Sequence, residues 1–77
     1  MFNDITSPTG VTSDEDGNLY IAAFSDNAIY QITPDGTKSI YLKDSRINGP
    51  IGIASDDKGN MYIANYNNDN VLKVSAQ

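Results

Sequence analysis

Carboxylates and amides are the side chains with which this sequence could do chemistry, and they gather in short runs. Two runs, 14–18 and 56–60, each end in Gly-Asn and together supply five Asp or Glu residues. Such oxygen ligands suit Ca²⁺, so one hypothesis is a cation-binding ring that uses Asp14 and Asp56. Turn formation is the favoured alternative, because Asp, Asn and Gly accept positive φ and bond to nearby backbone. An EF-hand is excluded, since a loop starting at Asp14 would place its required glycine at Leu19.

A second set of residues combines amides with aromatic rings. Amides hydrogen-bond to polar ligands and aromatic rings stack on them, so this set predicts a site for a sugar, another small polar ligand or a protein. Its members are Phe24, Asp26, Asn27, Arg46, Asn48, Tyr66, Asn67, Asn68 and Asp69. A structural alternative stays open, because Asn-rich loops are ordinary solvated turns and both aromatic rings could serve packing alone.

Residues for catalysis are scarce. The chain of 77 residues has no Cys and no His, so thiolate metal ligands and the commonest general base are absent. Its single Glu, Glu15, lies in a turn run, and no Ser or Lys has a base partner at an identifiable spacing. We therefore expect no enzyme activity and no catalytic residue. No cofactor is expected either, with Ca²⁺ as the one metal to test.

Charge and hydropathy limit the kinds of partner that we expect for this chain. The net charge of −5 disfavours nucleic acid and anionic membranes, because both are held mainly through Lys and Arg. The sequence has no apolar run long enough to span a bilayer, and residues 1–8 lack the basic and then apolar order of a signal peptide. We expect a soluble chain and assign no cellular compartment.

The sequence contains an internal repeat. Residues 8–35 align without a gap on residues 50–77, and nine of the 28 pairs are identical. Most of the other pairs exchange similar residues, so chance is a poor explanation. Self-similarity at such a spacing is typical of repeat architectures, including propellers.

The elements that position these runs are short β-strands. The apolar segments are β-branched or aromatic and end at Asp-Gly, Lys-Gly and Asn-Gly, which are strand and tight-turn signals. Strands are predicted near 10–14, 19–23, 28–33, 37–42, 52–55, 61–65 and 71–75. The runs 19–22 and 61–64 are continuously apolar, which indicates that both faces of these strands are covered.

The repeat resembles NHL-type β-propeller repeats, which are similar to those of gluconolactonase-like and streptogramin-lyase-like propellers. The resemblance rests on Pro-x-Gly-Ile/Val, on Asp/Lys-Gly-Asn-Leu/Met-Tyr-Ile-Ala and on Ile-Tyr-Gln-Ile-Thr-Pro-Asp-Gly at 29–36, and it covers residues 8–77. It implies a blade of four antiparallel strands per repeat and usually six blades per ring. It implies no particular activity, because scaffolds and enzymes share such repeats.

Two blades cannot close a ring, so the resemblance implies self-association. The expected fold is all-β, with two four-stranded antiparallel blades per chain and three copies forming a six-bladed propeller through head-to-tail contacts. Two copies with four blades and four copies with eight are the rival rings. An excised fragment of a longer chain, prone to aggregate alone, is the remaining alternative.

The repeat also predicts the domain boundaries. Residues 8–49 form the first blade, and residues 50–77 form the second, which lacks its own outermost strand because Gln77 aligns with Asp35. Residues 1–7 precede both blades and could supply that missing strand to a neighbouring subunit. The gap-free register instead aligns them with the connecting stretch 43–49.

Two functional hypotheses follow. The first is a non-enzymatic propeller scaffold or binding module, natural or made to study propeller assembly, which works through the amide and aromatic residues. The second is a fragment of a metal-dependent gluconolactonase-like hydrolase, a family that holds its metal with Glu, Asn and Asp from different blades. The resemblance to streptogramin lyases implies a catalytic histidine, which this chain lacks.

Overall fold

The computed structural model describes residue 5 and residues 7–75 of the chain. These residues form seven strands rich in β-branched and aromatic side chains. The strands are β1 (Pro8–Ser13), β2 (Leu19–Ala23), β3 (Ala28–Ile32), β4 (Lys38–Lys43), β5 (Pro50–Ser55), β6 (Met61–Asn65) and β7 (Asn70–Val74). In this described part of the chain, no helix is long and apolar enough to cross a membrane.

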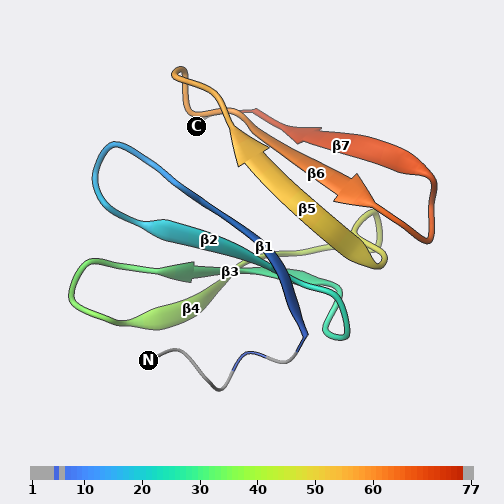
Figure 1. Cartoon of the computed structure of the whole chain (residues 1–77), viewed down its shortest axis with the longest axis horizontal. Helices are drawn as coiled ribbons and strands as arrows, with labels where there is room; N and C mark the ends of the chain where they lie inside the picture. The colour runs from blue at the N-terminus through green and yellow to red at the C-terminus, as the bar shows by residue number, and fades with distance from the viewer. Residues whose placement is uncertain (1–4, 6, 76–77) are drawn as a thin grey trace.

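The strands form two antiparallel sheets, each a series of consecutive hairpins (Figure 1). The first sheet has the order β1-β2-β3-β4 and the second the order β5-β6-β7. Because direction alternates, the tight turns 14–18, 33–37 and 56–60 lie together at one end of the molecule, which we call the turn end (left in Figure 1). The connections 24–27, 44–49 and 66–69 lie at the opposite end, the loop end.

The two faces of the first sheet have different neighbours. Residues opposite each other in an antiparallel pair point to the same side, so the strand register defines each face. The face that packs on the second sheet, here called the leading face, carries Gly10, Thr12, Tyr20, Ala22 and Ile29. The other side, the trailing face, carries Val11, Leu19, Ile21, Tyr30 and Ile32.

The second sheet repeats these two faces at the aligned positions of the sequence repeat. Its leading face carries Gly52, Ala54, Tyr62, Ala64 and Val71. Its trailing face carries Ile53, Met61, Ile63, Leu72 and Val74. The trailing face of the second sheet packs on the leading face of the first, so the two sheets stack in the same sense.

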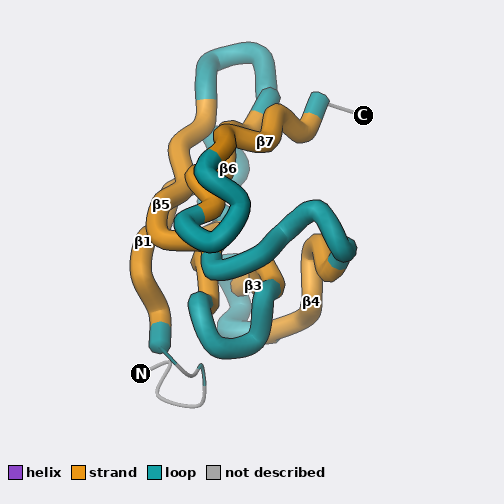
Figure 2. Tube along the Cα trace, turned by 90° about the vertical axis from the view of Figure 1, so that its right-hand side faces the viewer, coloured by secondary structure: helices purple, strands orange, loops and turns teal. Residues whose placement is uncertain are grey.

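The joint between the sheets is closest along β1 and β5, which lie side by side (Figure 2). Thr12 Oγ1 and Ser55 Oγ are 2.9 Å apart across it. A Cβ atom added at Gly10 would lie 3.2 Å from the Cα atom of Gly52, which is closer than ordinary van der Waals contact. Glycine at Gly10 therefore favours the close approach of the two backbones.

The main core fills this joint. Ile47, in the connection between the sheets, is 2% exposed and packs between them. Its buried neighbours come from both sheets and are Tyr20, Ala22, Ile29, Met61 and Ile63. A side chain that belongs to neither sheet thus seals the contact between both.

Two faces point outward from the stack. On the leading face of the second sheet Val71 is 66% exposed, whereas its repeat equivalent Ile29 is 0% exposed. On the trailing face of the first sheet Val11 is 60% exposed, while Ile5 packs against Ile21 and its neighbours. The leading face of the second sheet is therefore open at Val71, whereas the trailing face of the first sheet is exposed at Val11 and buried with Ile5 at Ile21, Ala23 and Ile32.

The all-β expectation and the seven predicted strands are confirmed. Where a second four-stranded sheet was expected, the described residues form a sheet of three strands, β5-β6-β7. Covered faces are confirmed for 20–23, which are buried throughout, but on β6 buried and half-buried residues alternate. The predicted closing strand in 1–7 rests largely on residues 1–4 and 6, which lie outside the described residues.

Candidate functional site

The loop end brings the predicted ligand-binding residues together. The nine residues come from its three segments, 24–27, 44–49 and 66–69, which are neighbours at the right of Figure 1. An open depression of about 370 Å³ lies at this end. It is lined by Asn27, Lys43, Asp44, Ser45, Ile47 and Asn48. Only two of the predicted residues, Asn27 and Asn48, therefore line a hollow.

Several of the loop-end amides bind each other. The Asn67 Nδ2 atom donates to Asn48 Oδ1 at 3.0 Å, and Asn27 Oδ1 accepts from the Gly49 N–H at 2.8 Å. Phe24 lies against the same segment, because a Cβ atom added at Gly49 would be 3.1 Å from its Cε1 atom. These residues tie the connection between the sheets to the two hairpin loops.

Other predicted residues present their side chains to solvent. Tyr66 is 64% exposed, and Asn68 and Asp69 are exposed beside it. Asp26 is half-buried, and its Oδ2 atom accepts a hydrogen bond from the Tyr30 hydroxyl at 2.8 Å. The exposed ring and amide at 66–68 are the groups at this end best placed to meet a polar ligand.

Arg46 is held by its neighbour Asp44. The guanidinium donates from Nε to Oδ1 at 3.1 Å and from NH2 to Oδ2 at 2.9 Å, a two-point contact. These hydrogen bonds lower the pKa of Asp44 to about 2 and raise that of Arg46. The pair lies at the surface, so it orients the loop more than it stabilises the fold.

The predicted set omits Asn65, the most buried polar residue of the described chain at 3% exposure. Its Nδ2 atom donates to the Arg46 carbonyl oxygen at 2.8 Å and to Asn70 Oδ1 at 3.1 Å. Its Oδ1 atom accepts from the Asn48 N–H at 3.2 Å. The sequence does carry a signal, because this asparagine occupies the repeat position at which the first unit has Ala23.

The repeat extends into the residues that precede the first sheet. Ser7 and Gly49 are equivalent in the gap-free register and have φ angles of 53° and 64°. The Phe24 N–H donates to the Ser7 carbonyl oxygen at 3.0 Å, and the Tyr66 N–H donates to that of Gly49 at 2.8 Å. These matching contacts support the register that aligns the start of the chain with the connection 43–49.

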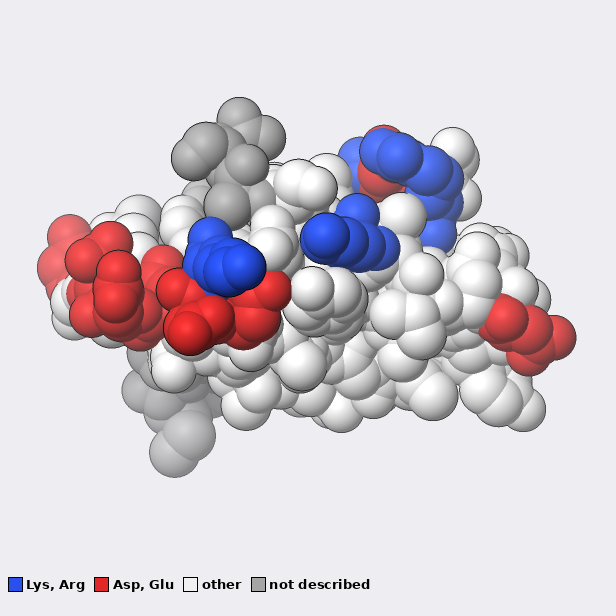
Figure 3. All heavy atoms as spheres, turned by 90° about the horizontal axis from the view of Figure 1, so that it is seen from above, with Lys and Arg blue, Asp and Glu red and all other residues white. Residues whose placement is uncertain are grey.

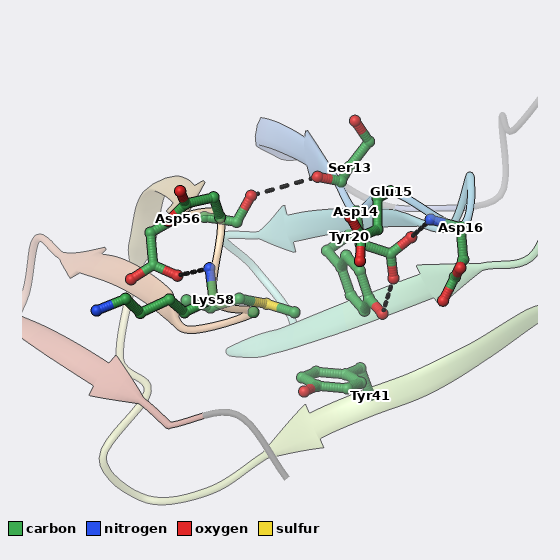
Figure 4. A pocket seen from close by; sticks show the side chains of 12 residues that line it. Ser13, Asp14, Glu15, Asp16, Tyr20, Tyr41, Asp56 and Lys58 are labelled. Atoms are coloured by element: carbon green, nitrogen blue, oxygen red, sulfur yellow. Dashed lines mark hydrogen bonds between the residues drawn. The ribbon is translucent and has the colours of Figure 1, made fainter.

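The larger hollow lies at the turn end, where the sequence predicted acidic turns. It is a cleft of about 430 Å³ between the β1–β2 and β5–β6 hairpins (Figure 4). Its lining includes Asp14, Tyr20, Tyr41, Asp56 and Lys58. The Tyr20 and Tyr41 rings pack edge to face with centroids 4.9 Å apart. No sequence signal pointed to Tyr41, whose strand has no counterpart in the second unit.

Asp14 and Asp56 each close a turn in the same way. The Oδ1 atom of Asp14 accepts from the N–H groups of Asp16 and Asn18, both at 3.0 Å. The Oδ1 atom of Asp56 accepts from the equivalent N–H groups of Lys58 and Asn60, both at 2.9 Å. The glycine in each turn adopts a positive φ, as such a turn requires.

The second oxygen of each aspartate is also occupied. Asp14 Oδ2 accepts from Asn18 Nδ2 and from the Tyr20 hydroxyl, and Asp56 Oδ2 has the equivalent partners. The side-chain hydrogen bond from Asn60 is the largest cause that holds the pKa of Asp56 at about 2, and the pKa of Asp14 is lowered similarly by Asn18. Burial raises the pKa of Tyr20, whose ring lies in the main core.

The turn end carries a dense group of negative charges, which is visible at the left of Figure 3. Besides Asp14 and Asp56, the cleft is lined by Glu15, Asp16 and Asp57. Among the described residues, no group of three His, Cys, Asp or Glu side chains is close enough to hold a metal ion. The acids therefore give the cleft a negative potential, while the two aspartates that sequence singled out serve the turns.

No protein-family model matches the chain, and no curated protein matches it. Solved structures do match. Virginiamycin B lyase from Staphylococcus aureus has a TM-score of 0.68 and 19% identity, over 96% of this chain and 28% of the lyase. The fold is that of a β-propeller segment. A catalytically inactive histidine-to-alanine variant of this lyase with quinupristin gives a TM-score of 0.68 and 16% identity, over 99% of this chain and 29% of the lyase.

A streptogramin B lyase gives a TM-score of 0.69 and 13% identity, over 99% of this chain and 28% of the lyase. At such identities the matches show the fold alone. The chain spans less than a third of the propellers that it resembles. The matches therefore support a propeller-type repeat, as the internal repeat of the sequence predicts.

Proposed function

We propose that this chain is a building block of a closed propeller, in which three copies with two NHL-type blades each form a six-bladed, non-enzymatic scaffold. One observation carries the proposal. Val71 on the leading face of the second sheet is exposed, although its repeat equivalent Ile29 is buried against a neighbouring sheet inside the chain. A head-to-tail contact that repeats with a rotation closes into a ring.

The proposed number of copies rests on the repeat and on the resemblance to NHL-type propellers. Two sheets that cover 28% of a lyase scale to about seven sheets in the whole protein. Chains of two blades form only even-numbered rings, so six and eight are the nearest closures. The resemblance to NHL-type repeats favours six and hence a homotrimer.

The ring would present the loop end three times around its axis. The exposed Tyr66 ring and the Asn67 and Asn68 amides then form a repeated polar surface, suited to a small polar ligand or a protein. A binding role is favoured over catalysis because Asp14 and Asp56, the strongest candidates for metal chemistry, already accept hydrogen bonds at both oxygens.

Light scattering coupled to size-exclusion chromatography tests the assembly. The expected mass is three times the 8.3 kDa of one chain. A mass four times that of one chain would replace three copies by four and overturn the six-bladed ring. A folded species of 8.3 kDa would overturn self-association altogether.

Thermal melting with Ca²⁺ and with EDTA tests the proposal that the scaffold does not depend on a metal ion. A ligand that binds only the native state raises the melting temperature. We expect the same melting temperature in both conditions. A rise of several degrees with Ca²⁺ would instead support a metal-dependent propeller.

A further inference from the structure

We infer that the joint between copies reproduces the joint inside the chain, with Ile5 of each copy inserted where Ile47 lies within the chain. The trailing face of the first sheet of one copy then seats on the leading face of the second sheet of the next. This inference rests on the proposed self-association and adds which residues meet and in which register. The partner is a second copy of this chain.

Ile5 already occupies half of such a joint. It is the repeat equivalent of Ile47 and is 6% exposed. Within its own chain it packs on the trailing face of the first sheet, against Ile21, Ala23 and Ile32. Ile47 packs in the same way on the trailing face of the second sheet, and in addition reaches the leading face of the first. A leading face is absent from the neighbours described for Ile5, and the face that carries Val71 on a second copy would supply one.

The outward leading face has apolar residues at two positions where the internal joint has polar contacts, and it carries Lys73 where the buried face has Gln31. Thr9 Oγ1 donates to the Pro50 carbonyl oxygen at 2.7 Å across the internal joint, and the position equivalent to Thr9 is Ile51, which is 46% exposed. Thr12, whose hydroxyl meets Ser55 inside the chain, has Ala54 as its equivalent. The joint between copies therefore exchanges two polar contacts for apolar burial, as expected of a surface that mates with a protein face.

The glycines at the joint show how closely the backbones of two copies would have to approach. A Cβ at Gly10 would crowd the Gly52 backbone inside the chain, at 3.2 Å from its Cα atom. A Cβ added at Gly52 would meet only the Ala64 Cβ atom, at 4.0 Å, so the single chain has room for alanine there. Seating of a second copy would bring the backbone at its Gly10 against Gly52, and the space would then be required.

Disulfide trapping tests the register. The chain has no cysteine of its own, so only the introduced thiols can form a disulfide bond. The internal pair Thr12 and Ser55 has Ala54 and Ser13 as its equivalent between copies. On mild oxidation, the double variant Ser13→Cys, Ala54→Cys should give a non-reducing ladder of two and three linked chains. The matched control Thr12→Cys, Ser55→Cys should consume both thiols yet run as one chain.

The outcomes separate this joint from the proposed function. Absence of a ladder from the double variant, while the wild type is an oligomer and the control closes its internal bond, would overturn the joint and leave self-association standing. A wild type that is a single folded chain would overturn both. A ladder that ends at four would keep the joint and overturn the trimer.

Gly52→Ala supplies a second test that does not depend on oxidation. The added methyl group should weaken association by about tenfold or more, because overpacked contacts are strongly penalised. The circular dichroism spectrum of the dilute chain should stay unchanged. Association as tight as that of the wild type would contradict the close approach at this glycine, and hence the register.

Discussion

The leading faces of the two sheets show what a neighbour contributes to this fold. Ala22 and Ile29 on the first sheet are 0% exposed, whereas Ala64 is half-buried and Val71 is 66% exposed at the same positions of the second. The strand register is the same in both sheets. The difference is therefore the presence of a sheet on one face and its absence from the other, which means that burial here is supplied from outside the repeat unit.

The turn ends of the two sheets, by contrast, are alike. Asp14 and Asp56 close their turns with equivalent backbone and side-chain hydrogen bonds at similar distances. Such contacts lie within a few residues and need no neighbouring sheet. Each unit thus builds its own hairpins, whereas its apolar faces depend on the next unit.

The largest effect is expected at Ile29, the buried residue of the equivalent pair Ile29 and Val71. Ile29→Ala should lower the free energy of unfolding by about 2–5 kcal/mol, because it leaves a cavity in the joint. Urea denaturation at several protein concentrations measures it, and the loss should not depend on concentration. Val71→Ala is the matched control, and its loss should grow with protein concentration as copies associate. Equal and concentration-independent losses would contradict the distinction between the two faces.

The close approach of β1 and β5 gives the next prediction. Gly10→Ala should destabilise the chain by about 1–3 kcal/mol, since its Cβ would lie 3.2 Å from the Gly52 Cα atom. Thermal melting followed by circular dichroism measures the loss. A gain in stability, as expected where only the flexibility of glycine is removed, would show that the two backbones are not in contact there.

Asn65 distinguishes the loop ends of the two units. Asn65→Ala gives the second unit the residue found at Ala23 and removes hydrogen bonds to Arg46, Asn48 and Asn70. We expect a loss of about 1–3 kcal/mol, because buried backbone partners lose their bonds.

The exposed Asn68 is the matched control for this change, since Asn68→Ala should alter the free energy of unfolding by less than about 0.5 kcal/mol. Chemical denaturation compares the two variants. If both changes had equally small effects, Asn65 would not anchor the connection between the sheets.

The smallest effect is expected from the acid titration of the turns. Asp56 has a folded pKa of about 2, below its ordinary value of 3.8, so it stabilises the fold above pH 3.8. This contribution should be lost as the pH falls through 2. Asp14 also has a lowered pKa and should act in the same direction.

Melting temperatures between pH 5 and pH 2 measure this effect. In Asp56→Asn the melting temperature should fall less steeply as the pH is lowered, because the amide cannot titrate. Asp14→Asn should have a similar effect if the two turns are equivalent. If the melting temperature of both variants fell as steeply with pH as that of the wild type, the turn aspartates would not cause the loss of stability in acid.

Most of the fold that could be predicted came from local signals in the sequence. The Asp-Gly and Lys-Gly turns and the β-branched runs placed all seven strands, because hairpin geometry depends on neighbouring residues. The hydroxyl groups of Tyr20 and Tyr62 have equivalent partners because the two tyrosines occupy the same position of the repeat. The contact of Tyr20 with Tyr41 could not be inferred from the repeat, because β4 has no counterpart in the second unit and the contact depends on tertiary geometry.

The candidate sites were less predictable than the strands. The amide-rich segments did gather at the loop end, but no sequence pattern indicated that Asn48 and Asn67 bind each other or how deeply Asn65 is buried. Both depend on side-chain geometry across loops that are distant in sequence. The larger cleft instead formed at the turn end, where hairpins from the two sheets meet.

Solvent access at position 71 tests the central claim most directly. In a chain without cysteine, the thiol introduced by Val71→Cys reports on the outward leading face, and Ile29→Cys reports on the covered one. We predict that maleimide labels Val71→Cys slowly in concentrated solution and much faster on dilution, while Ile29→Cys stays protected at both concentrations. Fast labelling of Val71→Cys at every concentration would show that no copy covers this face.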